Sequence, residues 1–427
     1  MTSGVIVLIG SFILLLILRV PIALTLVASS LITGIYLGID PAAIVQRMVG
    51  GLNSFSLLAI PFFILAGEIM NEGGISRRLI NLANVIIGKV RGGLAMVNVL
   101  ASTFFGGISG SALADTSSLG SVLIPMMRKQ GYDKDYSVSV TISASIQGVM
   151  IPPSHNMIIY STAAGGVSVG ALFMGGLGPG LLLGFAVLVL SYVLAVKRKY
   201  PKGEPVKKEE IPRIVWEGLL GLLTVVIIMG GILSGIFTAT ESAAIGTLYA
   251  FIITFFIYRE IPITRMVAIL HRTFNTLAMV LFLIGASSAF GYLLALLRVP
   301  QLVSEGLISI SPNDFVTILI IVIILLLLGC VMDMAPLILI ATPILLPVAT
   351  TTGMDPVHFG VLLILCLGVG LLTPPVGSVL FVGSAIGRLS IEKVSKAMLP
   401  FYGVMIVIVL LVAYVPSISL WLPSFFK

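Results

Sequence analysis

The stretch Gly148–Ser154, GVMIPPS, places two adjacent prolines in the middle of an apolar run long enough to cross a bilayer. Proline has no backbone N–H and clashes with the preceding helical turn, so one in a helix interior costs about 3 kcal/mol. The pattern therefore predicts a span that is broken at its centre. A membrane helix tolerates such a break only where another group satisfies the freed backbone atoms.

The composition is that of an integral membrane protein. Of 427 residues, 58% are hydrophobic and only 10% are charged, against roughly 25% charged residues in soluble domains. Apolar windows of about 20 residues, enough to cross a hydrocarbon core about 30 Å thick, recur along the chain. The first window lacks the flanks of a signal peptide and is expected to be a retained helix. The predicted spans are 4–18, 21–38, 54–70, 135–165, 171–196, 214–235, 237–257, 275–297, 357–387 and 396–422.

Two further apolar stretches, 93–127 and 315–350, are too long for one crossing and too short for two crossings with a turn. Each carries Gly, Ser or Asp near its centre. This pattern predicts two re-entrant helical hairpins, whose irregular tips are covered by protein or by a wet cavity.

If both stretches are hairpins and the N-terminus is outside, the basic residues separate almost completely between the two sides of the membrane. Arg47, Arg298 and Lys427 then lie outside, and the other 21 of the 24 Lys and Arg residues lie inside, many in the loop Lys197–Arg213. This is the positive-inside bias of membrane proteins. It accounts for the net charge of +7, so no nucleic-acid partner is expected.

The double proline is repeated 222 residues later, where Gly370–Val376 reads GLLTPPV. The same offset pairs Pro125 with Pro347, without a gap between the matched positions. An odd number of crossings separates the two hairpins, so the first begins and ends inside and the second begins and ends outside. The two halves are therefore predicted to be inverted repeats, and broken helices in inverted repeats are typical of secondary transporters.

The predicted fold is an all-α polytopic membrane protein with two inverted repeats, residues 1–197 and 214–427, joined by a cytoplasmic loop, 198–213. Each repeat contributes scaffold helices, one hairpin and one proline-broken helix. The inward-opening hairpin covers about 93–127 and its broken helix about 135–165. The outward-opening hairpin covers about 315–350 and its broken helix about 357–387.

Main-chain oxygens at the breaks suggest sites for sodium, a hard cation that accepts carbonyl and hydroxyl ligands. In the first repeat the break would meet the hairpin tip Gly106–Asp115, GGISGSALAD, where glycines allow the turn. The returning arms of both hairpins would direct their positive helix ends at a shared cavity and hold an anionic substrate. The first predicted sodium site consists of Ser109, Ser111, Gly148, Ile151 and Pro153. The second consists of Gly329, Asp333, Gly370, Thr373 and Pro375. Possible supporting residues are Asp115, Ser154 and Asn156.

Simpler interpretations stay open for each motif. A Pro-Pro pair can be a packing kink, and Ser-Gly-Ser can mark close helix packing. Asp115 and Asp333 can be helix caps, although acids inside a membrane are more often functional. They can also form the dyad of an intramembrane hydrolase, but the tips share no catalytic pattern. A channel is a third option, but no filter sequence is evident.

Two other segments have predicted positions but no predicted chemistry. The inside stretch 71–93 is expected to be an amphipathic arm along the membrane surface. Glu68 and Glu241 lie near the ends of predicted spans and are expected at the membrane interface.

At these motifs the chain resembles the large membrane subunit of TRAP transporters, the DctM-like or SiaM-like permeases of the ion-transporter superfamily. The resemblance covers nearly the whole chain and rests on GGISGSALAD with IPPS, and on MDMAPLILIATPILLP with LLTPPVGS. It implies sodium-coupled uptake, with Na⁺ as the coupling ion, across a bacterial inner membrane. The hairpins and broken helices would move as an elevator against the scaffold, and the N-terminus would be periplasmic.

The resemblance also implies partners. A periplasmic binding protein would deliver the substrate, and a four-helix small membrane subunit would brace the scaffold. No such segment precedes the first helix, so this subunit is expected to be a separate chain. The implied substrates are carboxylates such as sialic acid or C4-dicarboxylates, and the sequence is most similar in general appearance to the sialic-acid branch. A transporter of this kind is not an enzyme.

Overall fold

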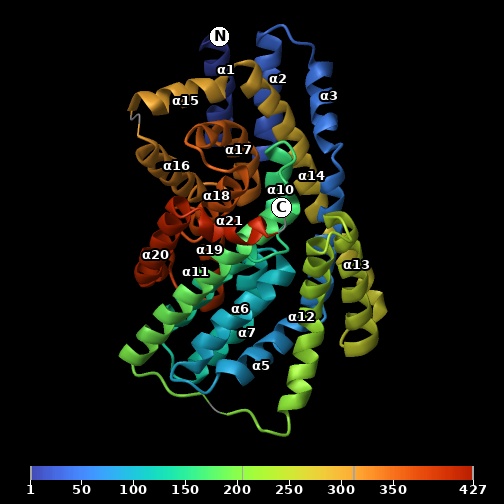
Figure 1. Ribbon diagram of the computed structural model, residues 1–427, viewed down its shortest axis with the longest axis vertical. Helices are drawn as coiled ribbons and strands as arrows, with labels where there is room; N and C mark the ends of the chain where they lie inside the picture. The colour runs from blue at the N-terminus through green and yellow to red at the C-terminus, as the bar shows by residue number, and fades with distance from the viewer. Residues whose placement is uncertain (1, 204, 311–312, 426–427) are drawn as a thin grey trace.

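The computed structural model describes residues 2–203, 205–310 and 313–425, and every regular element among them is helical. Lys427, predicted outside, lies beyond the described residues. Figure 1 shows an elongated molecule with the N-terminal helices at its upper end and the loop after α11 at its lower end. Seven of the described helices are long and apolar enough to cross a membrane.

The first half of the chain contains the helices from α1 to α11. They are α1 (Thr2–Ile17), α2 (Ile22–Tyr36), α3 (Pro41–Leu52), α4 (Ala59–Glu72, preceded by the short turn Phe55–Leu58), α5 (Ile75–Ile87), α6 (Gly93–Ser109), α7 (Ala112–Lys129), α8 (Lys134–Ser145), α9 (Gln147–Met150), α10 (His155–Ala163) and α11 (Val169–Lys197).

The second half contains the helices from α12 to α21. They are α12 (Ile211–Leu233), α13 (Ala239–Ile252, extended by a π-helix, Ile253–Tyr258), α14 (Met266–Leu296, preceded by the 3₁₀ turn Ile263–Arg265), α15 (Val299–Ile310), α16 (Asp314–Gly329), α17 (Met334–Thr351), α18 (Pro356–Gly370), α19 (Ser378–Gly387), α20 (Ile391–Tyr414) and α21 (Ser417–Ser424).

Most predicted spans match these helices, and the differences have local causes. The span predicted at 396–422 is wrong at its end, because α20 stops at Tyr414, two residues before Pro416, and the residue before a proline avoids helical geometry. Helix α14 begins nine residues before the predicted 275. Helices α3 and α15 were not predicted. Helix α3 begins where the Asp40 carboxylate accepts a hydrogen bond from the backbone N–H of Ala42.

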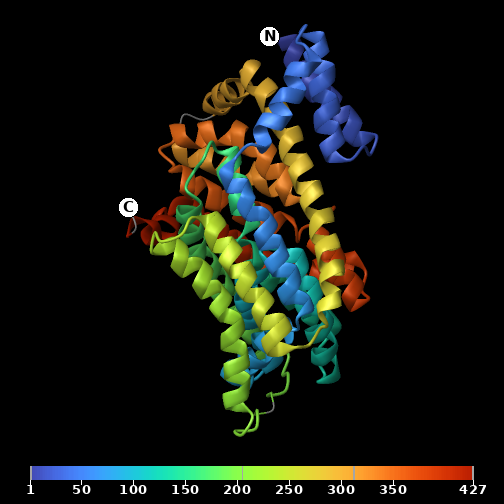
Figure 2. The ribbon, with the colours of Figure 1, turned by 90° about the vertical axis from the view of Figure 1, so that its right-hand side faces the viewer.

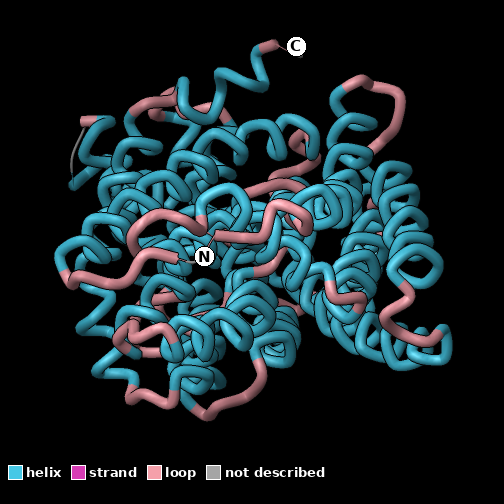
Figure 3. Tube along the Cα trace, turned by 90° about the horizontal axis from the view of Figure 1, so that it is seen from below, coloured by secondary structure: helices cyan, strands magenta, loops and turns pink. Residues whose placement is uncertain are grey.

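The helices form two packed groups. Helix α4 packs against α13 and α14, while α2 and α3 pack along α14. Figure 1 places α12, α13 and α14 on the right, and in Figure 2 they face the viewer. The second group consists of the hairpins α6–α7 and α16–α17 together with the broken helices. Figure 3 looks along the long axis and shows most helices roughly end-on.

Both ends of the first hairpin lie beside the segment that follows α11. The backbone N–H of Gly92, just before α6, donates to the carbonyl of Pro201 at 2.9 Å. After α7, the ring of Tyr132 packs on that of Tyr200, with centroids 4.6 Å apart. The chain therefore enters and leaves this hairpin at one end of the molecule, called here the basic end because it carries the Lys197–Arg213 loop.

Both ends of the second hairpin lie beside the last turn of α20. The Tyr414 hydroxyl donates to the carbonyl of Phe315 at the start of α16. Beyond α17, the ring of His358 contacts the carbonyl of Val412 at 2.6 Å. Helix α21 follows α20 and packs on the first half of α11, where a Cβ on Gly175 would meet the carbonyl of Ser419 at 3.1 Å. The two hairpins therefore open toward opposite ends of α11.

Helix α5 is amphipathic, as predicted for the segment 71–93, and its apolar face packs against α6 and α12. Arg78 on α5 anchors this corner. Its guanidinium lies 3.1 Å from the Glu260 carboxylate, 3.5 Å from that of Glu217 and 3.7 Å from the ring centroid of Tyr258. The Arg78 side chain is only 11% exposed, so these contacts are largely shielded from water.

We expect Arg78→Ala to lower the free energy of unfolding by about 2 kcal/mol, because it removes the cation beside Glu260 and one of the two cations beside Glu217. The matched control is Arg213→Ala, which removes a second partner of Glu217 whose side chain is 84% exposed. The control should not change stability measurably, since exposed ion pairs contribute little. Thermal unfolding in detergent checks this, and equal midpoints for the two variants would contradict the prediction.

Candidate ion and substrate site

The chain breaks at both double prolines, as predicted. Helix α9 ends at Met150 and α10 begins at His155. Because Pro152 and Pro153 have no N–H, the carbonyls of Gly148 and Val149 lack their helical donors. Equivalent breaks separate α18 from α19, and the bonds Pro152–Pro153 and Pro374–Pro375 are both cis.

The tip of the first hairpin lies directly against the first break. A Cβ on Gly148 would lie 3.1 Å from the carbonyl oxygen of Ser111, and one on Gly106 would lie 2.9 Å from that of Gln147. The Ser111 hydroxyl accepts a hydrogen bond from the N–H of Ala114 and caps α7. Glycine is therefore required on both sides of this contact. The structure brings together Ser111 and Gly148, members of the first predicted site.

The same tip also contains Ser109. The Ser109 hydroxyl accepts from the N–H of Ser111 at 3.3 Å. Ile151, the residue before the prolines, donates its N–H to the carbonyl of Gln147. Ser154 is fully buried, and its hydroxyl has no hydrogen-bond partner within the described part of the chain. The first break thus contains both an unpaired buried hydroxyl and carbonyls without helical donors, oxygen groups of the kind that bind a small hard cation.

The second tip and break are in even closer contact. A Cβ on Gly370 would lie only 2.4 Å from the Cα and carbonyl carbon of Gly329. The N–H of Val376, just after the prolines, donates to the carbonyl of Cys330 at 3.0 Å. The Thr373 hydroxyl, within the break, donates to the carbonyl of Val369 in the last turn of α18. Gly329, Gly370 and Thr373 thus gather where the second site was predicted.

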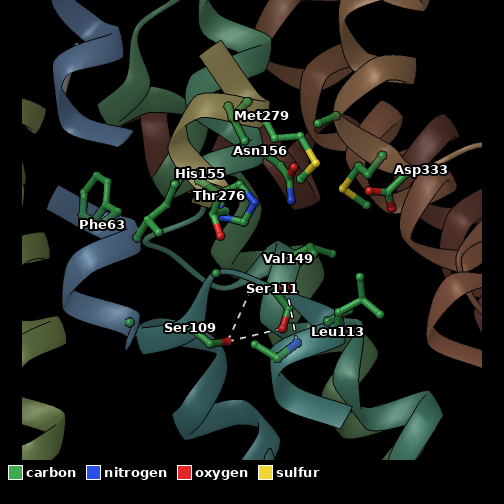
Figure 4. Close-up of a pocket in the computed structure, with 18 of the residues that line it drawn as sticks. Phe63, Ser109, Ser111, Leu113, Val149, His155, Asn156, Thr276, Met279 and Asp333 are labelled. Carbon is green, nitrogen blue, oxygen red and sulfur yellow. Dashed lines mark hydrogen bonds between the residues drawn. The ribbon is translucent and has the colours of Figure 1, made fainter. Parts of the chain in front are cut away.

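A cavity of about 710 Å³ lies between the two tips and the α4–α14 surface. Figure 4 shows its labelled side chains converging from both sides. The N-termini of α7, α10 and α17 line it, and no lysine or arginine is among the described residues on its wall. The wall includes Ser109–Ala114, Val149, Pro153, His155, Asn156, Asp333–Pro336, Phe63, Glu68, Asn71, Thr276 and Met279.

The two aspartates occupy different environments. Asp115 is buried inside the first hairpin, where the Ser102 hydroxyl donates to its Oδ1 at 3.3 Å, and it is not on the cavity wall. Asp333 precedes α17 and lines the cavity with an exposed side chain. Neither carboxylate makes a capping hydrogen bond. The cap interpretation is therefore not supported, and the two acids do not face one another across the cavity as a hydrolase dyad would.

Sequence reasoning missed the wall that α4 and α14 contribute. Glu68, expected at the interface, lines the cavity, and its carboxylate accepts a hydrogen bond from Arg272 Nε at 2.9 Å. Thr276 lies one helical turn beyond Arg272 and also lines the cavity. The available signal was the i, i+4 spacing of these two polar residues within an apolar span. Glu241 is exposed at the start of α13 and forms a capping box with Thr238.

An all-helical membrane protein with polar, broken segments around a central cavity is the architecture of a transporter. The model of the family "Tripartite ATP-independent periplasmic transporter, DctM component" matches residues 9–418, and the chain belongs to this family. Its members are membrane transport permeases and not enzymes.

Curated relatives align over nearly the full chain. An uncharacterised protein, YgiK of Salmonella typhimurium, is 43% identical, and the alignment covers 99% of this chain and 98% of YgiK. The sialic acid TRAP transporter large permease SiaM of Vibrio cholerae is 40% identical, with 91% and 90% covered. A C4-dicarboxylate permease of the same organism is 37% identical over 96% of this chain and 95% of its own. These identities do not single out the sialic-acid branch.

The fold also matches a solved transporter structure. The YdaH transporter of Alcanivorax borkumensis superposes with a TM-score of 0.61, with 86% of each chain covered. At 14% sequence identity this match concerns the fold alone.

Proposed function

We propose that this chain is the large membrane subunit of a sodium-coupled TRAP transporter that imports a small carboxylate. The observation that carries the proposal is the paired contact between a hairpin tip and a proline break, made once in each half of the chain. Family membership supports the transport function. The sodium coupling rests on the chemistry of the paired contacts.

Each paired contact offers several oxygen ligands within a small volume. The first offers the hydroxyls of Ser109 and Ser111 with main-chain oxygens from Gly148 to Pro153. The second offers the Thr373 hydroxyl with main-chain oxygens near Gly329 and Gly370, and Asp333 lies on the adjacent cavity wall. Hard cations such as sodium bind oxygen ligands of this type. A bound cation would take the place of the N–H donors that these carbonyl oxygens lack.

The cavity suits an anion of modest size. Its volume of about 710 Å³ lies within the range of small-molecule sites, roughly 300–1,000 Å³. The N-termini of α7, α10 and α17 direct backbone N–H groups and positive dipole ends toward it, which favours a carboxylate. We infer a carboxylate of the sialic-acid or C4-dicarboxylate type, the substrates named for two of the relatives.

We further propose that the two halves are inverted repeats and that the substrate moves by an elevator mechanism. The hairpins open toward opposite ends of α11, as inversion requires. The cavity lies between the hairpin side and the α4–α14 side, where sliding of one group against the other would carry it across the membrane. We also propose that the basic end lies in the cytoplasm and the N-terminus in the periplasm of a bacterial inner membrane, an orientation that the positive-inside bias supports.

Two partners complete the proposal. A periplasmic binding protein would deliver the carboxylate, and a separate small membrane subunit would support the scaffold in the lipid bilayer. Both follow from membership of the tripartite family.

We expect uptake by the reconstituted transporter to require a sodium gradient. Thr373→Ala should raise the sodium concentration for half-maximal uptake about tenfold, because one ligand of a cation site is worth about 1–2 kcal/mol. Thr317→Ala is the control, since the Thr317 hydroxyl, like that of Thr373, donates to the carbonyl of the residue four positions earlier, and Thr317 lies within the continuous helix α16. Its sodium dependence should be unchanged. Uptake that proceeds equally well without sodium would reject the proposed coupling.

A further inference from the structure

A hydrogen bond joins the two sides of the cavity at one edge. The Ser118 hydroxyl on α7 donates to Oδ1 of Asn71 on α4. Asn71 and the neighbouring Ser117 both line the cavity and have exposed side chains. Helix α7 packs mainly on α6, α8 and α19, makes smaller contacts with α5 and α9, and contacts α4 less than any of these. This hydrogen bond therefore spans a junction at which α4 and α7 make few direct contacts.

This edge of the cavity faces the basic end of the molecule. Helix α4 ends at Glu72, just beyond Asn71, and the chain continues through α5 to Val90, whose carbonyl accepts from the N–H of Gly203 at 3.4 Å. On the other side of the junction, Ser121 lies one turn beyond Ser118 toward the open end of the hairpin and is exposed. The surfaces on both sides of the hydrogen bond thus continue from the cavity toward the basic end.

The charges along this edge are balanced. Glu68 on the cavity wall accepts from Arg272 Nε, and Glu72 accepts from the same guanidinium. Arg265 lies 3.9 Å from Glu72 as a second cation. Two carboxylates beside the passage would repel a departing anion if they were unpaired, whereas two cations at hydrogen-bond or ion-pair distance neutralise them.

We propose that the cavity exchanges its small carboxylate with the basic end through the junction between α4 and α7, and that the Asn71–Ser118 hydrogen bond is the gate. The Glu68–Arg272 pair keeps this passage electrically neutral. This inference rests on the proposed function, because it assumes that the cavity holds an anion. It assigns gating to two residues outside both sodium sites.

The test measures access to Ser117 with a membrane-impermeant anionic thiol reagent. Ser117→Cys is placed in a background in which Cys330→Ser and Cys366→Ala remove both native thiols. The full transporter is expressed with its partner subunits, and the reagent is added to inside-out or right-side-out vesicles. We expect labelling from the side of the basic end. The control position is Ser121→Cys, which lies below the gate and should label rapidly in every variant.

Opening the gate should accelerate labelling at the cavity position only. Ser118→Ala should raise the labelling rate of Ser117→Cys about fivefold, the effect of losing a hydrogen bond worth about 1 kcal/mol. Asn71→Ala should have the same effect, and the double variant should be no faster than either single one. Unchanged rates in Ser118→Ala and Asn71→Ala, or labelling only from the opposite side, would overturn the gate.

The charge of the passage is tested by comparing anionic and cationic reagents. Arg272→Gln should slow the anionic reagent at Ser117→Cys about fivefold and accelerate the cationic one, since a charge a few ångströms away contributes about 1 kcal/mol in water. Adding Glu68→Gln should restore both rates. Equal rates for the two reagents in Arg272→Gln would contradict the role of the ion pair.

These labelling rates depend on neither sodium nor the binding protein. If the labelling rates do not change as expected while uptake still depends on sodium, the gate alone is rejected. Loss of sodium dependence alongside intact gating rejects the proposed coupling alone.

Discussion

Gly370→Ala is expected to shift sodium-dependent uptake to much higher sodium concentrations while the protein still inserts and folds. The added Cβ would lie 2.4 Å from two backbone atoms of Gly329, and backbone cannot move aside by changing a rotamer. The second hairpin tip must therefore separate from the break. Overpacking of this kind costs about 2–3 kcal/mol, which corresponds to a roughly 30- to 150-fold loss of sodium affinity at the second site.

Gly403→Ala is the matched control, because Gly403 lies within α20 and a Cβ there meets nothing within 4 Å. Uptake by the control should equal that of the native protein. Sodium titration of uptake in proteoliposomes separates the two variants, with size-exclusion profiles to confirm that both fold. A Gly370→Ala protein with native sodium affinity would show that the tip and the break need not touch.

Replacing both prolines of the first break is expected to be equally damaging. In Pro152→Ala/Pro153→Ala, two new N–H groups can donate to the carbonyls of Gly148 and Val149. Alanine also favours the helix by about 3 kcal/mol over each proline. The span should then close into a continuous helix, and sodium affinity should fall by more than 100-fold as the carbonyl ligands become occupied.

Pro400→Ala is the control for this experiment, since Pro400 is exposed within the continuous helix α20. It should retain native uptake. Circular dichroism should show a small gain in helix for the double variant. Full sodium dependence in that variant would mean that the break serves packing and not ion binding.

The breaks and hairpins were predictable because their causes are local. Proline at 152 and 153 removes donors wherever the segment lies in the fold, and Gly110 adopts a positive φ that favours glycine at the tip. The lengths of the apolar runs fixed the hairpin limits to within two residues. Such signals need no knowledge of tertiary packing.

The features that the sequence did not predict depend on tertiary contacts. Helix α15 follows a long apolar span and carries no distinctive pattern of its own, and the end of α20 depends on Pro416, which apolar windows do not register. The α4–α14 wall of the cavity was also missed, because any apolar helix could in principle pack beside the tips. Asp115 illustrates the same limit, since only the fold shows that it faces Ser102 inside the hairpin and not the cavity.

The cavity touches both hairpin tips at once, and this has a thermodynamic consequence for the proposed cotransport. A solute held there contacts Ser109–Ala114 from one half and Asp333–Pro336 from the other. Suppose that bound alkali ions order these two segments and thereby raise the affinity for the carboxylate by some factor. The bound carboxylate must then raise the affinity for the ions by that same factor. A calorimetric titration of either species in the presence of the other would yield one number, the free energy that links the two cargoes.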